Sequence, residues 1–347
     1  MTNGHSGVHL CGSVPLADSE AVFRQAATRL GDRLRRIPDG ETGVRDNWVV
    51  WQLPKLQAHP DLETVIPSDP RYGPAPRVRP RPGVDPGSIT FGALGYSAAA
   101  IESWQVFSRL RDEGVIPPGV RFQVSLPTPV AVVAPFVAEH HPELERAFEA
   151  RLLAELAEIV AAVPAADLAV QWDTAVEFGI LEGVFPAWFG TDDETLEAGI
   201  VDRLVRLGDA VPEPVELGYH LCYGDFEHRH FVEPADTSRL ASVAARVSAG
   251  LGRPLHWLHL PVPRDRADVD YFLPLKALDL PAETTLYLGL VHATDGVEGG
   301  LRRIAGAKQI LTSFGVSTEC GMGRRPAEQI PYLLDVHARL ADSLQES

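Results

Sequence analysis

His220 and Cys222 are the strongest chemical signal in the sequence. They stand two positions apart at the end of the apolar segment "VELGYHLC". Side chains two positions apart on a β-strand point to the same face of the sheet. Imidazole nitrogen and thiolate sulfur are both ligands that zinc prefers. The pair therefore offers two ligands of a zinc site, provided that another part of the chain brings a third.

Cys320 is the candidate for the third ligand, because it ends another predicted strand in the segment "VSTECG". A set of two cysteines and one histidine leaves the fourth tetrahedral position of zinc open, as in catalytic zinc sites. Structural zinc sites more often show paired C-x-x-C spacing, which this sequence lacks. The spacing alone leaves an alternative open. Cysteine is among the most buried residue types, so all three cysteines, Cys11 included, could be core residues.

Composition and charge narrow the class of protein. The chain has 347 residues, 45% of them hydrophobic, and a formal net charge of −16. Such an acidic chain does not suit the phosphate backbone of nucleic acids, whose binding needs basic patches. No apolar run approaches the roughly 20 residues that span a bilayer. With three cysteines and no signal-peptide pattern, we expect a cytoplasmic protein. Its expected partners are small molecules, and neither a nucleic acid nor a membrane. Whether the chain forms a homo-oligomer stays open.

The fold is predicted from nine short apolar segments that alternate with amphipathic ones. This alternation indicates a mainly parallel sheet, and the chain length suits a (β/α)8 barrel of the TIM type. One of the nine candidates is surplus, and residues 88–94 are one choice, in an extra hairpin. The predicted strands are 8–15, 33–41, 88–94, 121–129, 167–174, 215–225, 255–263, 285–296 and 315–323. The predicted helices include 142–162, 193–207, 236–251, 297–311 and 327–344, and Asp18 and Asp236 are predicted N-caps.

Residues 67–87 interrupt this pattern with many prolines. Proline excludes a continuous helix or a central strand there. A domain linker is one interpretation. The favoured one is a loop insertion in a single catalytic domain that spans residues 1–347, and a loop of this length is a candidate lid.

Polar and reactive side chains gather where the predicted strands end. Parallel strands bring their carboxyl ends to one face, which is where barrel enzymes build their active sites. The same pattern also disfavours a non-catalytic binding protein, because burying these groups costs free energy unless they pair or react. The residues concerned are Gly12, Ser13, Asp39, Gly40, Glu41, Thr128, Asp173, His220, Cys222, His259, His292, Glu319 and Cys320.

The ordered motifs resemble the C-terminal catalytic barrel of cobalamin-independent methionine synthases. "HLCYGDF" is similar to the family motif H-x-C-Y-x-x-F, and "STECGMGRR" is similar to D-C-G-x-x-x-R, with Glu319 in place of Asp. "CGSVP", "PDGETGVRDNWV", "QWDTA" and "LVHATDG" resemble G-S-F-P, H-G-E-x-x-R-N-D-M-V, Q-x-D-E-P and D-I-H-S in the same order. The matches run from Cys11 to Arg325 and so cover nearly the whole chain.

The resemblance implies a (β/α)8 barrel and a zinc-dependent transferase. In the family, zinc binds a small thiol and activates it as a thiolate for methyl or alkyl transfer. Carried over to this sequence, the metal ligands are His220, Cys222 and Cys320.

The resemblance also implies roles for four further residues. Ser13 would bind the carboxylate of the thiol substrate, and Glu41 and Asp173 would bind its ammonium group. Asp173 and His292 are the predicted catalytic residues, with His292 as an acid–base group near the electrophile. Structural roles stay open for all four: a cap for Ser13, hydrogen-bond hubs for the two acids, and a core histidine for His292.

Two departures from the family pattern favour a single-barrel branch. The full-length family has an additional N-terminal half that helps to bind a polyglutamated folate, whereas this chain matches the catalytic half. The family also has a zinc-adjacent glutamate on the strand after H-x-C. Here that strand reads "HWLHLPVPR" and offers His256 and His259. His259 could lie near the metal or be a packed histidine, and the second interpretation is favoured. Epoxyalkane–coenzyme M transferases are a similar single-barrel branch with a His/Cys/Cys zinc site. The thiol and the alkyl donor, whether folate, another methyl donor or an epoxide, stay open.

Two other enzymatic interpretations remain. An open zinc could activate water in a lyase or hydrolase. Alternatively, a metal-free barrel similar to decarboxylases would rely on its acids and on Arg324 and Arg325.

Overall fold

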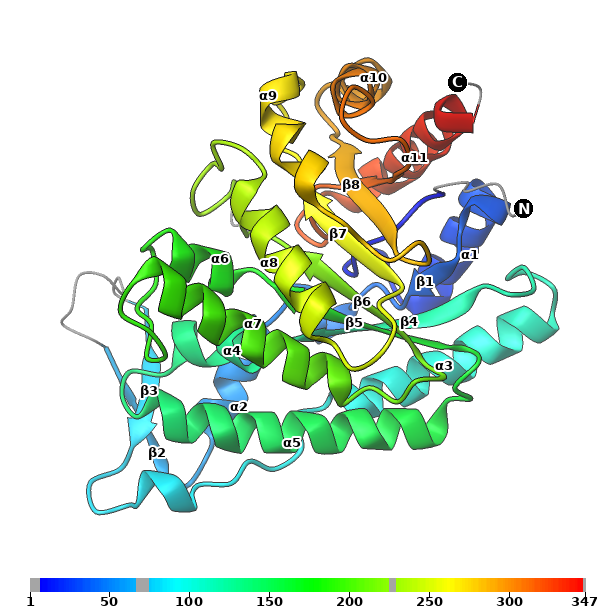
Figure 1. Cartoon of the computed structure of the whole chain (residues 1–347). Helices are drawn as coiled ribbons and strands as arrows, with labels where there is room; N and C mark the ends of the chain where they lie inside the picture. The colour runs from blue at the N-terminus through cyan, green and yellow to red at the C-terminus, as the bar shows by residue number, and fades with distance from the viewer. Residues whose placement is uncertain (1–6, 67–74, 225–228, 346–347) are drawn as a thin grey trace.

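The computed structural model describes residues 7–66, 75–224 and 229–345. Seven parallel strands form a curled sheet in the order β1-β4-β5-β6-β7-β8-β9, surrounded by helices (Figure 1). A second, two-stranded sheet pairs β2 with β3 in antiparallel fashion. The strands are β1 (Arg36–Pro38), β2 (Leu62–Val65), β3 (Arg77–Pro80), β4 (Arg121–Pro127), β5 (Leu168–Thr174), β6 (Glu216–Leu221), β7 (Trp257–Pro261), β8 (Thr285–Val291) and β9 (Gly315–Thr318).

The segment around Val8 lies between the two edges of the large sheet. Val8 forms parallel bridges with Leu34, next to β1, and with Val316 in β9. The N–H of Val8 donates to the carbonyl oxygen of Arg33 at 2.9 Å. The N–H of His9 donates to the carbonyl oxygen of Val316 at 3.0 Å. The predicted strand 8–15 is therefore represented by these bridges rather than by a regular strand.

Seven of the predicted strands are confirmed, as β1 and β4 to β9, but residues 88–94 do not form a strand. The reason lies in their backbone partners. The N–H groups of Leu94 and Gly95 both donate to the buried carboxylate of Glu155, and Gly95 has a φ of 98°. These groups are therefore not available for a strand ladder. The extra hairpin is instead made by β2 and β3, which the apolar pattern did not predict.

Strand β3 lies inside the predicted insertion of residues 67–87, of which 67–74 are outside the described residues. Pro80 ends β3 on a two-stranded sheet, where a missing N–H donor is tolerated. The β2–β3 hairpin therefore gives part of this segment regular structure.

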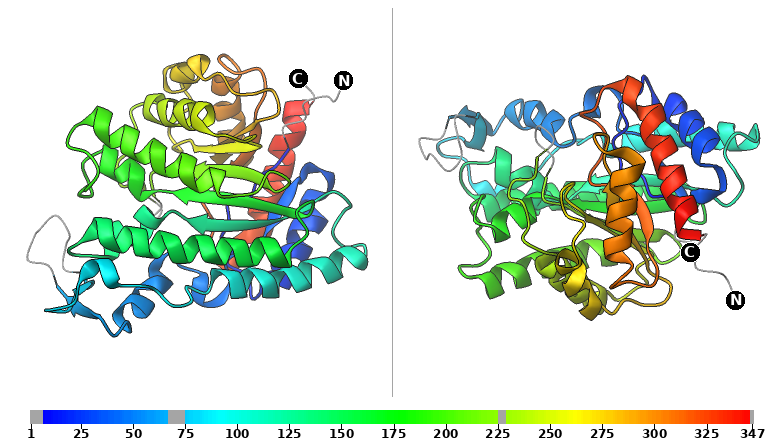
Figure 2. Two further views of the ribbon diagram at one scale, coloured as in Figure 1. Left: turned by 60° about the horizontal axis from the view of Figure 1, so that its bottom comes forward. Right: turned by 90° about the horizontal axis from the view of Figure 1, so that it is seen from above.

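The helices cover the outer side of the large sheet, and α11 packs beside α1 (Figures 1 and 2). The N-cap predicted at Asp18 is confirmed, because its carboxylate accepts the N–H of Ala21. The cap of α8 is Thr237 rather than Asp236, whose carboxylate accepts the N–H of Ser238. The helices are α1 (Ser19–Leu30), α2 (Leu53–Gln57), α3 (Tyr96–Asp112), α4 (Pro129–Phe136), α5 (His141–Ala162), α6 (Val176–Leu181), α7 (Asp193–Asp209), α8 (Ser238–Gly250), α9 (Val269–Phe272), α10 (Gly296–Ala307) and α11 (Ile330–Gln345).

None of the helices in the described ranges combines the length and the apolar character that crossing a bilayer requires.

Candidate metal centre

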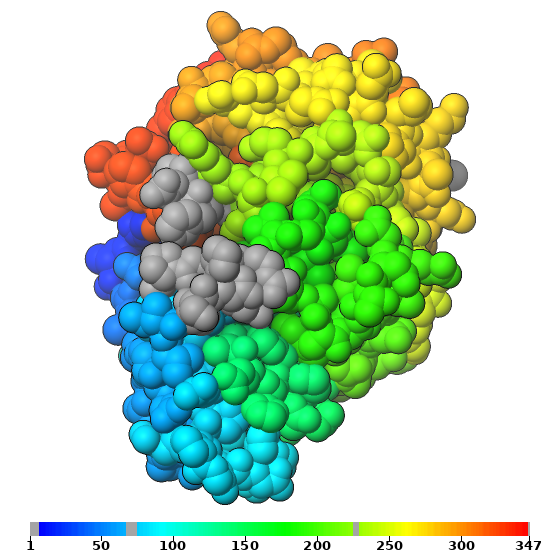
Figure 3. Space-filling view, turned by 90° about the vertical axis from the view of Figure 1, so that its left-hand side faces the viewer, coloured from blue at the N-terminus to red at the C-terminus, as the bar shows by residue number. Residues whose placement is uncertain are grey.

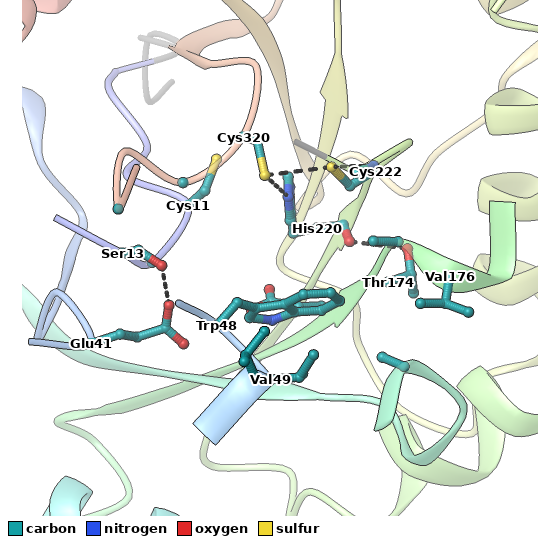
Figure 4. Close-up of a pocket in the computed structure, with 18 of the residues that line it drawn as sticks. Cys11, Ser13, Glu41, Trp48, Val49, Thr174, Val176, His220, Cys222 and Cys320 are labelled. Atoms are coloured by element: carbon teal, nitrogen blue, oxygen red, sulfur yellow. Dashed lines mark hydrogen bonds between the residues drawn. The ribbon is translucent and has the colours of Figure 1, made fainter. Parts of the chain in front are cut away.

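The three predicted metal ligands converge at the carboxyl ends of β6 and β9 (Figure 4). His220 lies within β6, Cys222 directly follows it, and Cys320 follows β9. The Cys320 Sγ is 3.5 Å from the Cys222 Sγ and 3.6 Å from the His220 Nε2. The sequence-based prediction that these residues are neighbours is thus met by the geometry.

The spacing of the donor atoms fits a tetrahedral zinc ion. Zinc–sulfur bonds of about 2.3 Å and zinc–nitrogen bonds of about 2.0 Å place two sulfurs about 3.8 Å apart and nitrogen and sulfur about 3.5 Å apart. The observed separations of 3.5 and 3.6 Å agree with these values to a few tenths of an ångström. The N–H of Gly224 also donates to the Cys222 Sγ at 3.3 Å, which helps to hold the sulfur in place.

A short chain of hydrogen bonds fixes the ring of His220. Its Nδ1 is 2.6 Å from the Nδ1 of His259, and the Nε2 of His259 is 2.9 Å from the carbonyl oxygen of Thr318. The carbonyl accepts only, so the Nε2 of His259 carries the proton. Burial lowers the pKa of His259 to about 4, so the ring is neutral and its Nδ1 accepts from His220. The Nε2 of His220 is then unprotonated and directed at the two sulfurs.

His259 is fully buried, as expected of a packed histidine, and it also contacts a predicted metal ligand. It occupies the position in which metal sites commonly place a partner that orients a ligand histidine. Strand register brings the two rings together, because His220 and His259 are paired residues of β6 and β7. This pairing requires a glycine at position 218, since a Cβ there would lie 2.0 Å from the ring of Trp257.

Replacing His259 with phenylalanine should lower the zinc affinity about 10- to 100-fold, because outer partners of metal ligands contribute this much. The measurement is competition with a chelating indicator. His337→Phe is a matched control: this histidine is equally buried, has a pKa of about 4 and bonds the Leu333 carbonyl oxygen on α11. Equal affinities for the two variants would show that His259 does not position a ligand.

Cys11 lies beside the predicted centre without belonging to the same cluster. Its sulfur, with the ring nitrogens of His220 and His259, forms a second group that could hold a metal. The Cys11 Sγ is 3.3 Å from the Ser317 Oγ, and burial raises the pKa of the thiol well above its usual value. A protonated, hydrogen-bonded thiol is a poorer metal ligand than a thiolate, so Cys11 is less suited to bind a metal.

Ser13, Glu41 and Asp173 line the same cavity as the metal ligands. The Ser13 hydroxyl donates to the Glu41 carboxylate, and the Gln171 amide donates to Asp173 at 2.7 Å. Burial raises the pKa of Glu41 to about 7, and burial together with Glu41 raises the pKa of Asp173 well above its usual value. Two neighbouring buried acids of this kind favour a proton or a bound cation between them.

Asp39 holds the turn that presents Glu41. Its carboxylate accepts the N–H of Glu41 at 2.9 Å, the Ser103 hydroxyl at 2.9 Å and the Arg45 guanidinium at 2.7 Å. These bonds support a backbone φ of 50° at Glu41, in the left-handed region that non-glycine residues rarely adopt. Strain of this kind is typical of functional sites.

His292 is buried and is not among the residues that line the cavity. Its Nδ1 is 3.4 Å from the Glu319 Oε2, and its Nε2 is 2.9 Å from the Val262 carbonyl oxygen. Glu319 directly precedes Cys320 and also contacts the His230 Nε2 at 2.7 Å. His292 therefore lies next to the metal ligands through its contact with Glu319, and its acid–base role stays a prediction.

His230 contacts Glu319, next to the predicted ligand Cys320, and the sequence did not predict this contact. Burial alone would lower its pKa, but hydrogen bonds to Glu233 and Glu319 outweigh this and raise it to about 10. The sequence indicated an anion site or a solvent-facing role for His228 and His230. His230 instead binds two carboxylates of its own chain, whereas His228 lies outside the described residues.

The cavity has a volume of about 280 Å³ and joins the metal ligands to the acids. It opens at the carboxyl ends of the strands, as predicted for a barrel-type site. Segments from the N-terminal, central and C-terminal parts of the chain meet on the face that Figure 3 shows. The remaining wall is mainly apolar, and no pattern in the sequence predicted its members, among them Trp48 and Phe136.

Fold and site together define an α/β protein with a curled parallel sheet and a Cys/His cluster at its carboxyl edge. No protein-family model and no curated protein sequence matches the chain. Solved structures do. A B12-independent methionine synthase from Shewanella sp. W3-18-1, in complex with selenomethionine, has a TM-score of 0.62 at 13% identity, over 99% of this chain and 98% of that one.

Two further structures have a TM-score of 0.56. One is a putative vitamin-B12-independent methionine synthase from Listeria monocytogenes, at 18% identity over 94% of this chain and 86% of that one. The other is a methyltransferase from Methanosarcina mazei, at 12% identity over 99% of this chain and 95% of that one. At these identities the likeness establishes a shared fold, which agrees with the resemblance of the sequence motifs.

Proposed function

We propose that the protein is a zinc-dependent transferase that activates a small thiol for methyl or alkyl transfer. The observation that carries this proposal is the separation of the three donor atoms of His220, Cys222 and Cys320, which suits a tetrahedral zinc with one open position. The fold shared with methionine synthases and a methyltransferase supports it. We also infer that the segment around Val8 serves as the eighth strand and completes a (β/α)8 barrel.

In this proposal the site residues have separate roles in binding the metal and the thiol substrate. Zinc, when bound, would supply the positive charge that lowers the pKa of a coordinated thiol. His259 keeps the Nε2 of His220 free of a proton for the metal. Glu41 and Asp173 bind an ammonium group on the thiol substrate, whose positive charge relieves the repulsion between the two buried acids. Ser13 orients the Glu41 carboxylate through its hydroxyl.

Proton release on thiol binding tests this function. A free thiol has a pKa of about 8.5 and is mainly protonated at pH 7, so coordination as a thiolate should release about one proton per zinc. Homocysteine, which combines a thiol with an ammonium group, is a suitable probe. Calorimetric titration in buffers of different ionisation enthalpy counts the protons. Binding of the ammonium group can also displace a proton from the buried acids, so the zinc protein should release about one proton more than the zinc-depleted protein.

Two results would contradict the proposal. Binding that releases no more protons from the zinc protein than from the zinc-depleted protein would show that the thiol does not reach the metal, and would favour a metal-bound water in a lyase or hydrolase. Protein purified without chelator that contains no zinc, and cannot be loaded with it, would favour the metal-free interpretation with Arg324.

A further inference from the structure

We propose that the cavity wall around Trp48 is a binding subsite for an apolar alkyl group. The alkyl donor would accordingly be an uncharged molecule that carries such a group. This inference rests on the proposed function and specifies the substrate of the same site. In the transfer, a new sulfur–carbon bond forms as the bond from that carbon to its donor breaks, and the bonding electron pair leaves with the donor. The subsite would hold the alkyl group beside the thiol sulfur.

The wall opposite the metal ligands is built almost entirely from hydrocarbon. In Figure 4, Trp48 and Val49 lie across the cavity from His220 and the two cysteines, with Val176 beside them. The rings of Phe185 and Phe231 meet edge to face, with centroids 5.0 Å apart, and line the same cavity. Trp48, Phe185 and Phe231 are only partly buried, so an apolar ligand would remove further hydrocarbon surface from water.

Trp48 is held in an unfavourable backbone conformation. Its φ is 45°, in the left-handed region, where a bulky aromatic residue is an outlier. Its side chain packs against the apolar cluster that includes Val130, Ala131 and Val176. Strain of this kind persists only where the surroundings enforce it, and it is found at ligand clamps. Trp48 and Glu41 share this property, and they line the apolar and the acidic parts of one cavity.

The charges around the cavity disfavour an anionic donor. The described lining residues include three acids, Glu41, Asp46 and Asp173, and one guanidinium, that of Arg324. Arg324 already donates to the Asn47 Oδ1 at 3.3 Å. An anionic donor would therefore find few positive groups in this lining, and its burial without a partner would cost free energy. The volume of about 280 Å³ also suits a small donor.

A series of thiols with increasing chain length tests the subsite. Ethanethiol, butanethiol and hexanethiol present the same sulfur to the zinc protein, and calorimetry gives each dissociation constant. If the chain enters the apolar wall, affinity should rise about fourfold per buried methylene. An ω-carboxylate on the hexyl chain should cancel most of that rise. A flat series, or tighter binding of the carboxylated thiol, would overturn the proposal.

Trp48→Ala should flatten the chain-length dependence, which is read as the ratio of hexanethiol to ethanethiol affinity. Trp104→Ala is the matched control, because Trp104 is also partly buried but packs on Phe107 outside the cavity. The same ratio in both variants would contradict a role for Trp48.

The proposed function can fail separately, in which case ethanethiol does not bind the metal. A series of 1-alkanols, which need no metal, then decides the apolar subsite. Tighter binding of hexanol than of ethanol by wild type, with a smaller ratio in Trp48→Ala, would support it. No difference between the two alcohols in the wild type would refute it.

Discussion

Cys320→Ser should reduce the zinc content from about one ion per chain to near zero. The Cys320 sulfur lies 3.5–3.6 Å from both other donor atoms, so its loss leaves one histidine and one cysteine. A serine hydroxyl is a poor substitute for a thiolate at zinc. Because partners outside the coordination shell already contribute about 10- to 100-fold in affinity, losing a direct ligand should cost more than that. Metal content after gel filtration, measured by mass spectrometry, gives the result.

Cys11→Ser is the control for this variant. Cys11 is also a cavity-lining cysteine, but its sulfur bonds the Ser317 hydroxyl and belongs to the second cluster with His220 and His259. We expect this variant to retain its zinc. If Cys11→Ser loses zinc and Cys320→Ser does not, the metal belongs to the second cluster and the assignment of ligands is wrong.

Glu41→Gln should stabilise the free protein at pH 8 and weaken the binding of an amine-bearing thiol. Burial raises the pKa of Glu41 from 4.5 to about 7. An acid whose pKa is raised by folding contributes stability below its unfolded pKa and loses it as the pH rises through the folded value. At pH 8 the ionised carboxylate thus costs about 3 kcal/mol, which the neutral amide avoids. At pH 4 the variant should show no gain.

Melting temperatures at pH 4 and pH 8, with homocysteine dissociation constants at pH 8, test this prediction. Glu177→Gln is a matched control, since burial raises the pKa of Glu177 to about 7 as well, and its carboxylate accepts the Thr128 hydroxyl outside the cavity lining. Both variants should gain stability at pH 8, but only Glu41→Gln should bind homocysteine more weakly. Equal binding by both variants would remove Glu41 from the proposed ammonium site.

The sequence predicted the parts of the site that depend on strand periodicity. The two-residue spacing of His220 and Cys222 places both at the end of β6, and the apolar runs of the parallel strands are long enough to be recognised. Cys320 was predicted as the third ligand because it follows another predicted strand, and the motif order supported this assignment. The contact of His259 with His220 depends on the register between β6 and β7, which a single sequence does not encode locally.

The remaining site residues depend on contacts between distant segments. Trp48 has a left-handed backbone that nothing in "RDNWV" signals, because such conformations are usually associated with glycine or asparagine. Residues 88–94 have the apolar pattern of a strand, but the N–H of Leu94 donates to Glu155, a residue of a helix about 60 positions away. Such side-chain capture of backbone donors competes with strand pairing, and an apolar pattern cannot reveal it.

X-ray absorption at the zinc edge, with and without homocysteine, tests the central claim most directly. The account predicts zinc bound by two sulfurs and one nitrogen, with a lighter atom in the fourth position, and a third sulfur at about 2.3 Å once the thiol is added. A coordination shell that keeps two sulfurs at saturating thiol would contradict activation of a thiol by the metal.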